Sequence, residues 1–378
     1  MRRALRVMGL AGGLAATIAG LLVAAAVAAP AAGWRVVASP SPRQQNQLLA
    51  VTAIPGGSGF WAVGYSQGPP DPLDVHTLIE HTTGSGWKVV ASPNPGTSGS
   101  ILSAVAAISP SDVWAVGDLN TPMHWNGRHW SLTPIPGAPA GGTFVAIAAV
   151  SADDVWAVGT YGRDGVPYSA HWNGHAWAIV AMAQAGAGQT VQLTGLTRIA
   201  GSSGLFAVGS EISIHGGQLI QRQLIERWNG SHWLMVAVPP LVHGAVTDSL
   251  SGVASVSGSS VWAIGEWTDP SLTSHPLFEH WSGMGWHVVA GPAGRAAPGA
   301  LTAVPGTTQL WATTLGTPGQ VAFHYTGTTW VERPVAVPAN SYGIELFGIA
   351  AGRGTGIVAV GSWNGAGVAI HTLVEGHP

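Results

Sequence analysis

Histidine is the residue type in this chain whose spacing most suggests chemistry. One histidine recurs in most copies of a repeated segment, at His81, His124, His171, His280, His324 and His371, with Arg227 replacing it in the fourth copy. Imidazole is a common metal ligand, so such a column raises the possibility of a metal centre. We assign the column to the third strand of each repeat, roughly 15 Å from a central axis, because strands lie about 4.8 Å apart. Equivalent residues of adjacent repeats are then more than about 10 Å apart, whereas metal ligands lie about 2 Å from a shared ion. We therefore expect no metal and no cofactor, and a hydrogen-bonding role for each histidine within its own repeat.

Nucleophilic and acid–base chemistry receives little support. The string from Gly64 to Gly68, GYSQG, matches the G-x-S-x-G pattern of hydrolases, but that pattern needs a strand, a sharp turn and a helix, and Pro69-Pro70 follows here. Three aspartates, Asp112, Asp153 and Asp154, recur in a turn, where aspartate bonds its own backbone. Glu80 and Glu279 precede two histidines of the column and point to the opposite strand face, so we expect them to be solvated. We predict no catalytic residues.

The repeated segment itself predicts the elements that carry these residues. Its clearest copy, Asp112–Trp130, reads DVWAVGDLNTPMHWNGRHW. A small aliphatic first strand precedes it; the WAVG-like run is the second strand, a variable loop and a third strand follow, and a fourth strand opens with tryptophan. Asn126-Gly127 predicts a tight hairpin whose positive-φ positions favour Asn and Gly.

Seven copies fill the chain, and the ends complement each other. Trp34–Pro42 matches only a fourth strand, and the seventh copy, near the carboxyl end, lacks one. Residues 34–378 divided among seven copies give about 49 residues each, as expected for propeller blades. We predict an all-β, seven-bladed β-propeller of four-stranded antiparallel blades, with residues 34–42 closing the last blade on Val368–Glu375. The predicted blades span about 48–95, 101–136, 144–182, 192–239, 248–292, 299–338 and 345–375.

Most tryptophans belong to the predicted core. Of the 18 tryptophans, all but Trp267 and Trp363 fall at repeat positions in the second, third or fourth strands. Cross-strand and sheet-on-sheet packing accounts for a large aromatic side chain at such positions.

The repeats resemble those of kelch and galactose-oxidase-like propellers, through the glycine after the second strand and the tryptophan that opens the fourth. The resemblance covers residues 34–378 and implies the fold. Two departures limit what it implies about activity: kelch repeats usually have a double glycine where this chain has one, and galactose-oxidase chemistry uses a cysteine, of which this chain has none. Asn directly precedes Gly at 126, 173 and 229, which also departs from the sialidase Asp-box.

The loops between second and third strands vary most, and function concentrates on variable loops held by a rigid scaffold. Aromatic side chains and carboxylates at this end of the blades suit stacking on a sugar or a protein hot spot. The ligand-binding residues that we predict are Tyr65, Asp118, Tyr161, Glu211, Glu266, Trp267 and Trp363. The alternative is that these rings only cover the blade ends.

Composition and the amino-terminal segment indicate where the protein acts. Met1–Ala29 has arginines at 2, 3 and 6, an apolar run and the small residues Ala26-Val27-Ala28, as in a secretory signal peptide; an uncleaved anchor is the alternative. The chain has no cysteine, a net charge of −3 and 8% charged residues, which argues against a nucleic-acid partner.

We therefore expect a secreted or cell-surface monomer. It would be a non-catalytic recognition or scaffold propeller that binds an extracellular glycan or a cell-envelope protein on the face carrying these loops. The alternative is a hydrolase or lyase acting on extracellular glycans, because propeller active sites leave little local motif.

Overall fold

A computed structural model describes most of the chain beyond the amino-terminal segment. The described residues are 33–57, 59–68, 74–83, 86–96, 99–118, 120–183, 186, 189–240, 242, 244–292, 294, 296–315, 321–354, 356–365 and 369–377. Residues 31–378 form one compact unit. The predicted signal peptide lies outside the described residues. In the part of the chain that is described, no helix has the length and apolar character needed to span a membrane.

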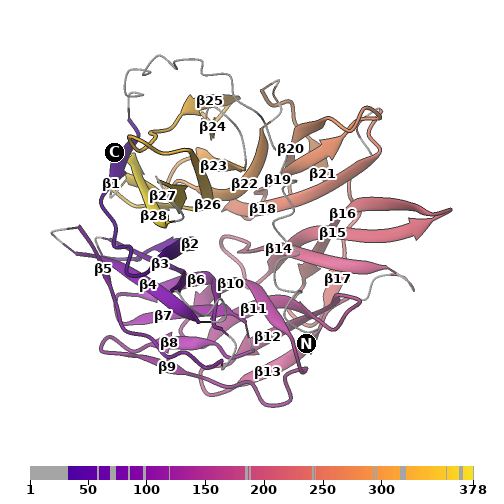
Figure 1. The fold of residues 1–378 in the computed structure, drawn as a ribbon. Helices are drawn as coiled ribbons and strands as arrows, with labels where there is room; N and C mark the ends of the chain where they lie inside the picture. Colours follow the sequence, from indigo (N-terminus) through magenta and orange to yellow (C-terminus); the bar gives the residue numbers. More distant parts are fainter. Residues whose placement is uncertain are drawn as a thin grey trace. The chain divides into compact units, whose positions relative to one another are not determined.

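Five antiparallel four-stranded sheets form blades of a β-propeller (Figure 1). Their strands are β6 (Leu102–Ser109), β7 (Asp112–Gly117), β8 (Met123–Trp125) and β9 (Trp130–Leu132); β10 (Thr143–Ser151), β11 (Asp154–Tyr161), β12 (Val166–Trp172) and β13 (Trp177–Ala181); β14 (Thr190–Arg198), β15 (Leu205–His215), β16 (Gln218–Trp228) and β17 (Trp233–Met235); β18 (Thr247–Ser257), β19 (Ser260–Thr268), β20 (Ser274–Trp281) and β21 (Trp286–Val288); β22 (Ala297–Ala303), β23 (Leu310–Leu315), β24 (Val321–Tyr325) and β25 (Trp330–Pro334).

The remaining eight strands form one mixed sheet, which differs from the prediction of separate first and last blades. Its order is β26 (Gly343–Gly352), β27 (Gly356–Asn364), β28 (Ile370–His377), β2 (Gln45–Ala53), β3 (Phe60–Gln67), β4 (Val75–Thr83) and β5 (Gly86–Val89), with β1 (Arg35–Val37) also pairing with β28. The two halves meet at one parallel pair, Gln45 with Ile370. The backbone N–H of Ile370 donates to Gln44 O at 2.9 Å, and Asn46 Nδ2 donates to Ile370 O at 3.0 Å. These bonds form because the chain leaving β1 turns back beside the start of β28.

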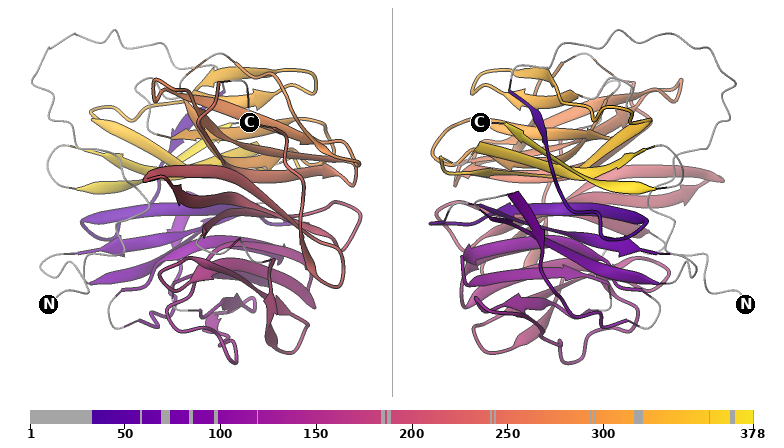
Figure 2. Two further views of the ribbon diagram at one scale, coloured as in Figure 1. Left: turned by 90° about the vertical axis from the view of Figure 1, so that its right-hand side faces the viewer. Right: turned by 60° about the vertical axis from the view of Figure 1, so that its left-hand side comes forward.

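The predicted pairing of the two chain ends is confirmed. β1 is antiparallel to β28, with Val36 opposite Glu375, and Figure 2 shows the indigo strand beside the yellow ones. Trp34, only 3% exposed, packs edge-on against Trp311 of β23, with ring centroids 5.6 Å apart. The segment beginning at Trp34 is therefore paired with β28 and packed against β23.

The glycine that ends the WAVG-like runs has a structural cause. In six copies the first strand bulges opposite this glycine, for example between Leu48 and Ala50 opposite Gly64. A β-carbon on Gly64 would lie 2.0 Å from Gln47 O, so only glycine fits. In β23 the sequence has Thr314 at this position. The pairing slips between Pro298 and Leu301, and the neighbouring Thr313 Oγ1 accepts from the N–H of Ala300 at 2.8 Å.

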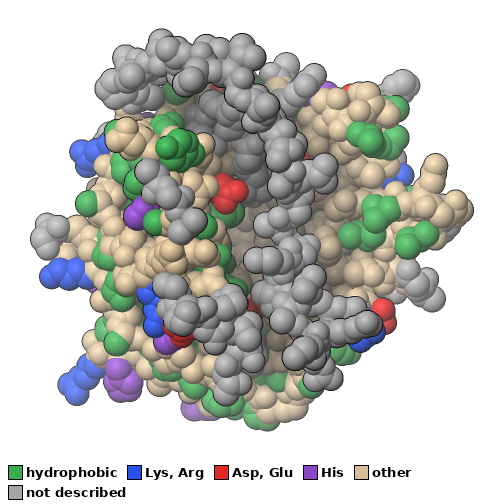
Figure 3. Space-filling view, in the orientation of Figure 1, with side chains coloured by type: hydrophobic (Ala, Val, Ile, Leu, Met, Phe, Trp, Pro, Cys, Tyr) green, Lys and Arg blue, Asp and Glu red, His purple; other side chains and the backbone are tan. Residues whose placement is uncertain are grey.

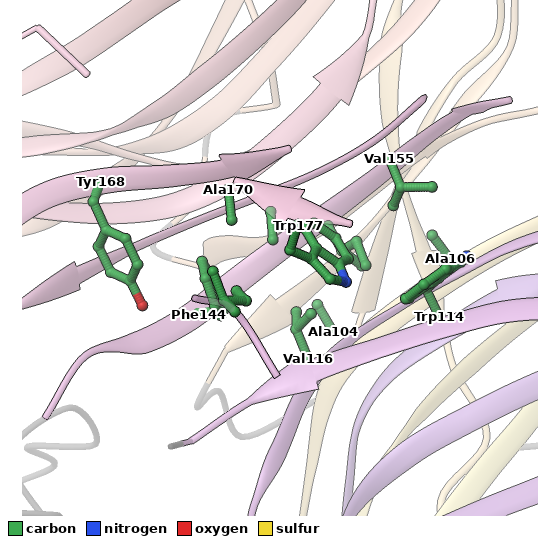
Figure 4. Packing of buried hydrophobic residues seen from close by; sticks show 12 residues of the cluster. Ala104, Ala106, Trp114, Val116, Phe144, Val155, Tyr168, Ala170 and Trp177 are labelled. Carbon is green, nitrogen blue, oxygen red and sulfur yellow. The ribbon is translucent and has the colours of Figure 1, made fainter. Parts of the chain in front are cut away.

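The core lies between adjacent sheets. The tryptophans predicted to lie in it are buried except for Trp125, Trp172 and Trp228 of the third strands, which are half-buried. All seven tryptophans that open fourth strands are buried, and so are the five in second strands. The cluster between the β6–β9 and β10–β13 blades shows the arrangement: Trp114, Phe144 and Trp177 point into one space (Figure 4). Trp114 and Trp177 meet edge-on with centroids 5.3 Å apart.

The predicted Asn-Gly hairpin is wrong in its detail. The turn between β8 and β9 has four residues, Asn126 to His129, and only Gly127 has positive φ, at 90°. Asn126 Oδ1 instead accepts from the backbone N–H groups of Arg128 and His129, at 3.0 and 3.1 Å. The asparagine side chain therefore stabilises the turn directly, in an Asx arrangement.

Candidate functional site

The seven predicted residues lie near one end of their blades, which we call the loop face: the end carrying the connections β3–β4, β7–β8, β11–β12, β15–β16, β19–β20 and β27–β28. They form two groups. Tyr161, Glu211, Trp267 and Trp363 stand two residues past the second-strand glycine, whereas Tyr65, Asp118 and Glu266 stand one residue past it. Successive strand residues point to opposite faces, so the first group faces the preceding sheet and the second group the following one. The seven therefore do not share one surface of a blade.

Each aromatic ring of the first group packs against a different part of the core. Tyr161 packs on the hydrophobic cluster between the second and third repeats. Trp267 packs on the cluster between the fourth and fifth repeats, and Trp363 on the cluster between the sixth and seventh. All three are half-buried. Trp267 stacks on His275 at 4.2 Å, and Trp363 on His371 at 4.5 Å between ring centroids. The two tryptophans are thus held rigidly at their edges of the loop face.

Burial shifts the pKa of three of the seven residues. It raises the pKa of the Asp118 and Glu211 carboxyls. Burial likewise raises the pKa of Tyr65, and the charge of Glu345 adds to that effect. Asp118 also bridges to Thr143, the first residue of β10, and so ties the loop face of one blade to the next.

The histidine column has the local role that was expected, with one error. His124 stacks on Trp114 at 4.2 Å, and its Nε2 lies 2.9 Å from Asp112 Oδ1, which also accepts from Trp114 Nε1. His171 repeats this arrangement with Trp156 and Asp154. Asp112 and Asp154 therefore bond tryptophan and histidine side chains of their own blade, where a bond to the turn backbone was expected. Within the described ranges, no group of three His, Cys, Asp or Glu residues is arranged to hold a metal.

The error concerns His371. The register pairs Trp363 with His371 and Val358 with Gly376, so Gly376 occupies the column in the last copy. His371 instead lies at the loop face, at the position of His275 in β20. The prediction placed His371 in the column because the loop before β28 is short. The third strand of the last repeat could therefore be aligned with the other repeats in more than one register.

The prediction that Glu80 and Glu279 are solvated is wrong. Both are fully buried, and so are Glu226 and Glu375 at the same third-strand position. Burial raises the pKa of Glu80 and Glu375 to about 8 and that of Glu226 and Glu279 to about 7. These side chains face the preceding sheet and not a cavity mouth.

Three of these glutamates bond the segment that leaves the preceding fourth strand. Glu226 Oε2 accepts from the N–H of Ala183 at 3.0 Å, and Glu375 Oε2 from the N–H of Ala336 at 3.2 Å. Each donor stands six residues past a fourth-strand tryptophan. For Glu80 that position is Pro40, which has no N–H, and the hydroxyl of Ser39 donates instead at 2.9 Å.

A cavity of about 930 Å³ lies at the opposite end, where the first strands turn into the second strands. All seven first strands line it with small residues, among them Ala53, Ala107, Ala149, Thr197, Ser255, Ala303 and Ala351. Its described lining residues include Arg198 and Arg353 and no carboxylate. The small aliphatic character of the first strands was the only sequence signal for this cavity.

The described surface is sparsely charged. In the space-filling view, apolar side chains are spread over the visible face and few charged groups are visible (Figure 3). An ion cluster at the start of β4 is an exception: Arg43 donates to Asp74 at 2.5 Å, and His76 Nε2 lies 2.6 Å from the same carboxylate. The hydrogen bond from Arg43 and that from His76 lower the pKa of Asp74.

Comparison with known proteins supports the fold. No protein-family model and no curated protein sequence matches the chain. Among solved structures, "YCF48 bound to D1 peptide" is similar with a TM-score of 0.58 and 15% identity, covering 92% of this chain and 97% of that one. YCF48 from Cyanidioschyzon merolae gives 0.56 and 16%, covering 92% and 99%. The extracellular domain of a putative hybrid two-component system from B. thetaiotaomicron gives 0.55 and 10%, covering 90% of this chain and 39% of that one. The chain is therefore a β-propeller; the kelch repeat type is not shown.

Proposed function

We propose that residues 34–378 form a seven-bladed ring, in which the eight-stranded sheet is the first and last blades joined at one bridge. A repeated contact supports this count. The second-strand aromatic of one copy meets the fourth-strand tryptophan of the next, as in Trp61 with Trp130 at 5.4 Å and Trp262 with Trp330 at 5.8 Å. Trp311 meets Trp34 in the same way, and Trp87 packs with Val358. Every copy thus has a successor, including the seventh.

We propose further that this propeller is a recognition module that binds a polypeptide partner on its loop face, outside the cytoplasmic membrane. The observation that carries the proposal is the pair of rigid, half-buried tryptophans, Trp267 on His275 and Trp363 on His371. Stacking removes rotamer freedom before binding, and pre-organised aromatic side chains are the usual anchors of protein interfaces. Export rests on the charged and apolar pattern of Met1–Ala29.

Two solved relatives in fold agree with a binding role, one bound to a peptide and one an extracellular domain. A glycan remains the other ligand class that aromatic rings could stack on, and the experiment below separates the two. The alternative of a glycan-active enzyme stays a prediction with no observation among the described residues in its favour.

The test presents the mature protein to a random peptide library and to a glycan array. We expect enriched peptides, whose binding weakens on Trp267→Ala or Trp363→Ala. Trp172→Ala serves as the matched control, because Trp172 is also half-buried but lies at the opposite end of its blade, bonded to Ala152 O. Each lost anchor should weaken binding by about tenfold or more. Binding only to glycans, or peptide binding that survives both substitutions, would contradict the proposal.

A further inference from the structure

A second cavity, of about 410 Å³, lies between the β14–β17 and β18–β21 blades at the loop face. It lies beside β16, which at 11 residues is the longest of the third strands. β16 runs from Gln218 to Trp228, but β17 pairs with it only at Glu226–Trp228. The first half of β16 therefore has no fourth strand beside it, and the connection that leaves β17 passes around the space that remains.

The floor of this cavity holds buried polar groups. Gln223 and Asp248 both line it, and each is only 5% exposed. The backbone N–H of Gln223 donates to Asp248 Oδ1 at 3.1 Å. The side-chain oxygen of Gln223, Oε1, has no hydrogen-bond partner although it is buried. An unsatisfied buried acceptor costs about 1–3 kcal/mol, so a donor from a ligand would be bound favourably here.

Glu279 is a buried acceptor at the same interface. Neither of its oxygens makes a hydrogen bond of ordinary geometry, and the Gln223 side chain is the donor that interacts with it. The other three buried glutamates accept from the segment after the preceding fourth-strand tryptophan. Here the donor position, six residues past Trp233, is Pro239, which is buried, lines the cavity and has no N–H. Among the described residues of this segment, none donates to Glu279.

The remaining lining defines the chemistry of a ligand. Glu211 and Asp248 supply carboxylates, and Arg222 is the one cation among the described lining residues. Burial raises the pKa of Asp248, and the charge of Arg222 partly opposes that effect. Arg222 Nη1 already donates to Gln221 O at 2.8 Å and to Val246 O at 2.7 Å. The walls are apolar, from residues such as Leu224 and Pro240. Free acceptors at the floor and apolar walls match a side chain with an aliphatic stem and a donor-rich cationic end.

We propose that this cavity binds the guanidinium group of an arginine side chain of the partner polypeptide. A guanidinium presents five N–H donors in one plane and accepts nothing, so it can bond Gln223 Oε1 and the Asp248 carboxylate together. Its aliphatic stem would pack against Pro239 and Leu224. The inference rests on the proposed function in one respect: the arginine belongs to the polypeptide partner proposed there.

The experiment uses two pentapeptides of glycine and serine, one with a central arginine and one with its neutral isostere citrulline, titrated into the mature protein by calorimetry. We expect the arginine peptide to bind at least about tenfold more tightly than the citrulline peptide. Asp248→Asn, which keeps an acceptor for the N–H of Gln223, should remove this preference. Glu211→Gln, at the rim of the cavity, should reduce it and is a second test that does not disturb the floor.

Asp164→Asn is the matched control, because Asp164 is an exposed carboxylate on the β11–β12 turn of another blade. The inference is overturned if the two peptides bind equally, if neither binds, or if Asp248→Asn and Glu211→Gln both leave the preference unchanged. Those outcomes leave the proposed function standing as long as library peptides still depend on Trp267 and Trp363. Loss of that dependence with the arginine preference intact would instead refute the proposed function alone.

Discussion

Replacing Glu80 by glutamine should change how stability depends on pH. Glu80 is fully buried between two halves of the mixed sheet, its Oε2 accepts from the Ser39 hydroxyl, and burial raises its pKa to about 8. In the unfolded chain a glutamate has a pKa of about 4.3. The folded-state pKa is therefore the higher one, so this group's contribution is fully present below about pH 4 and is lost as pH rises through about 8.

The magnitude follows from the two pKa values. Between them, the unfolded chain releases a proton that the folded chain retains, so the free energy of unfolding falls by up to about 1.4 kcal/mol per pH unit. Over the whole interval the loss is about 5 kcal/mol, which is large beside a typical domain stability of about 5–15 kcal/mol. Glu80→Gln removes the titration while the amide oxygen can still accept from Ser39.

The assay is guanidinium unfolding followed by tryptophan fluorescence at several pH values between about 5 and 9. We expect the variant's free energy of unfolding to fall less steeply with pH than that of the native chain, by up to about 1.4 kcal/mol per unit. Glu345→Gln, which removes an exposed carboxyl on β26, should leave the native slope unchanged. Equal slopes for the native chain and Glu80→Gln would refute the reasoning that burial keeps this carboxyl protonated.

Three further predictions concern the chain ends and the strand glycines. Trp34→Ala should lower the free energy of unfolding by about 3–5 kcal/mol, because the ring is buried; a denaturation midpoint like that of the native chain would show that β1 does not hold the last strands. Gly361→Ala should lower the free energy of unfolding by several kcal/mol, because its new β-carbon would lie 1.8 Å from Glu345 O. Gly343→Ala is the control: its β-carbon would meet open space, so the denaturation midpoint should change little. Similar effects of the two substitutions would contradict the argument that the first-strand bulge requires glycine. Mass spectrometry of the exported protein should find an amino terminus near Ala29, and an intact leader in the membrane fraction would indicate an anchor.

The sequence predicted the propeller because its repeat is explicit in residue types that the fold requires. Tryptophans at the start of fourth strands and glycines at the end of second strands recur with the blades, and both have structural causes in the sheet interfaces and in the first-strand bulge. The bulge itself could not be predicted, because it follows from how two strands pair and leaves no residue pattern other than the glycine.

The buried glutamates were missed although a signal was present. The position of Glu80 is apolar in three other copies, as Met123, Ala170 and Phe323, which is typical of a buried position. A charged residue was assigned to solvent because buried carboxyls are rare unless paired. The cavity beside Gln223 was beyond prediction, because it depends on how few residues of β17 pair with β16.

The pairing of β1 with β28 also determines when the molecule can finish folding. Ser39 Oγ lies 2.7 Å from Thr372 Oγ1 across 333 residues of sequence, so β1 must wait for β28 to be synthesised before it can pair. Until β28 has been synthesised, β1 has no strand to pair with. Bringing two segments so distant in sequence together is also slow. A chain that leaves the ribosome amino end first would carry an unpaired apolar strand through synthesis, and we expect it to benefit from a chaperone that covers Trp34 during that interval.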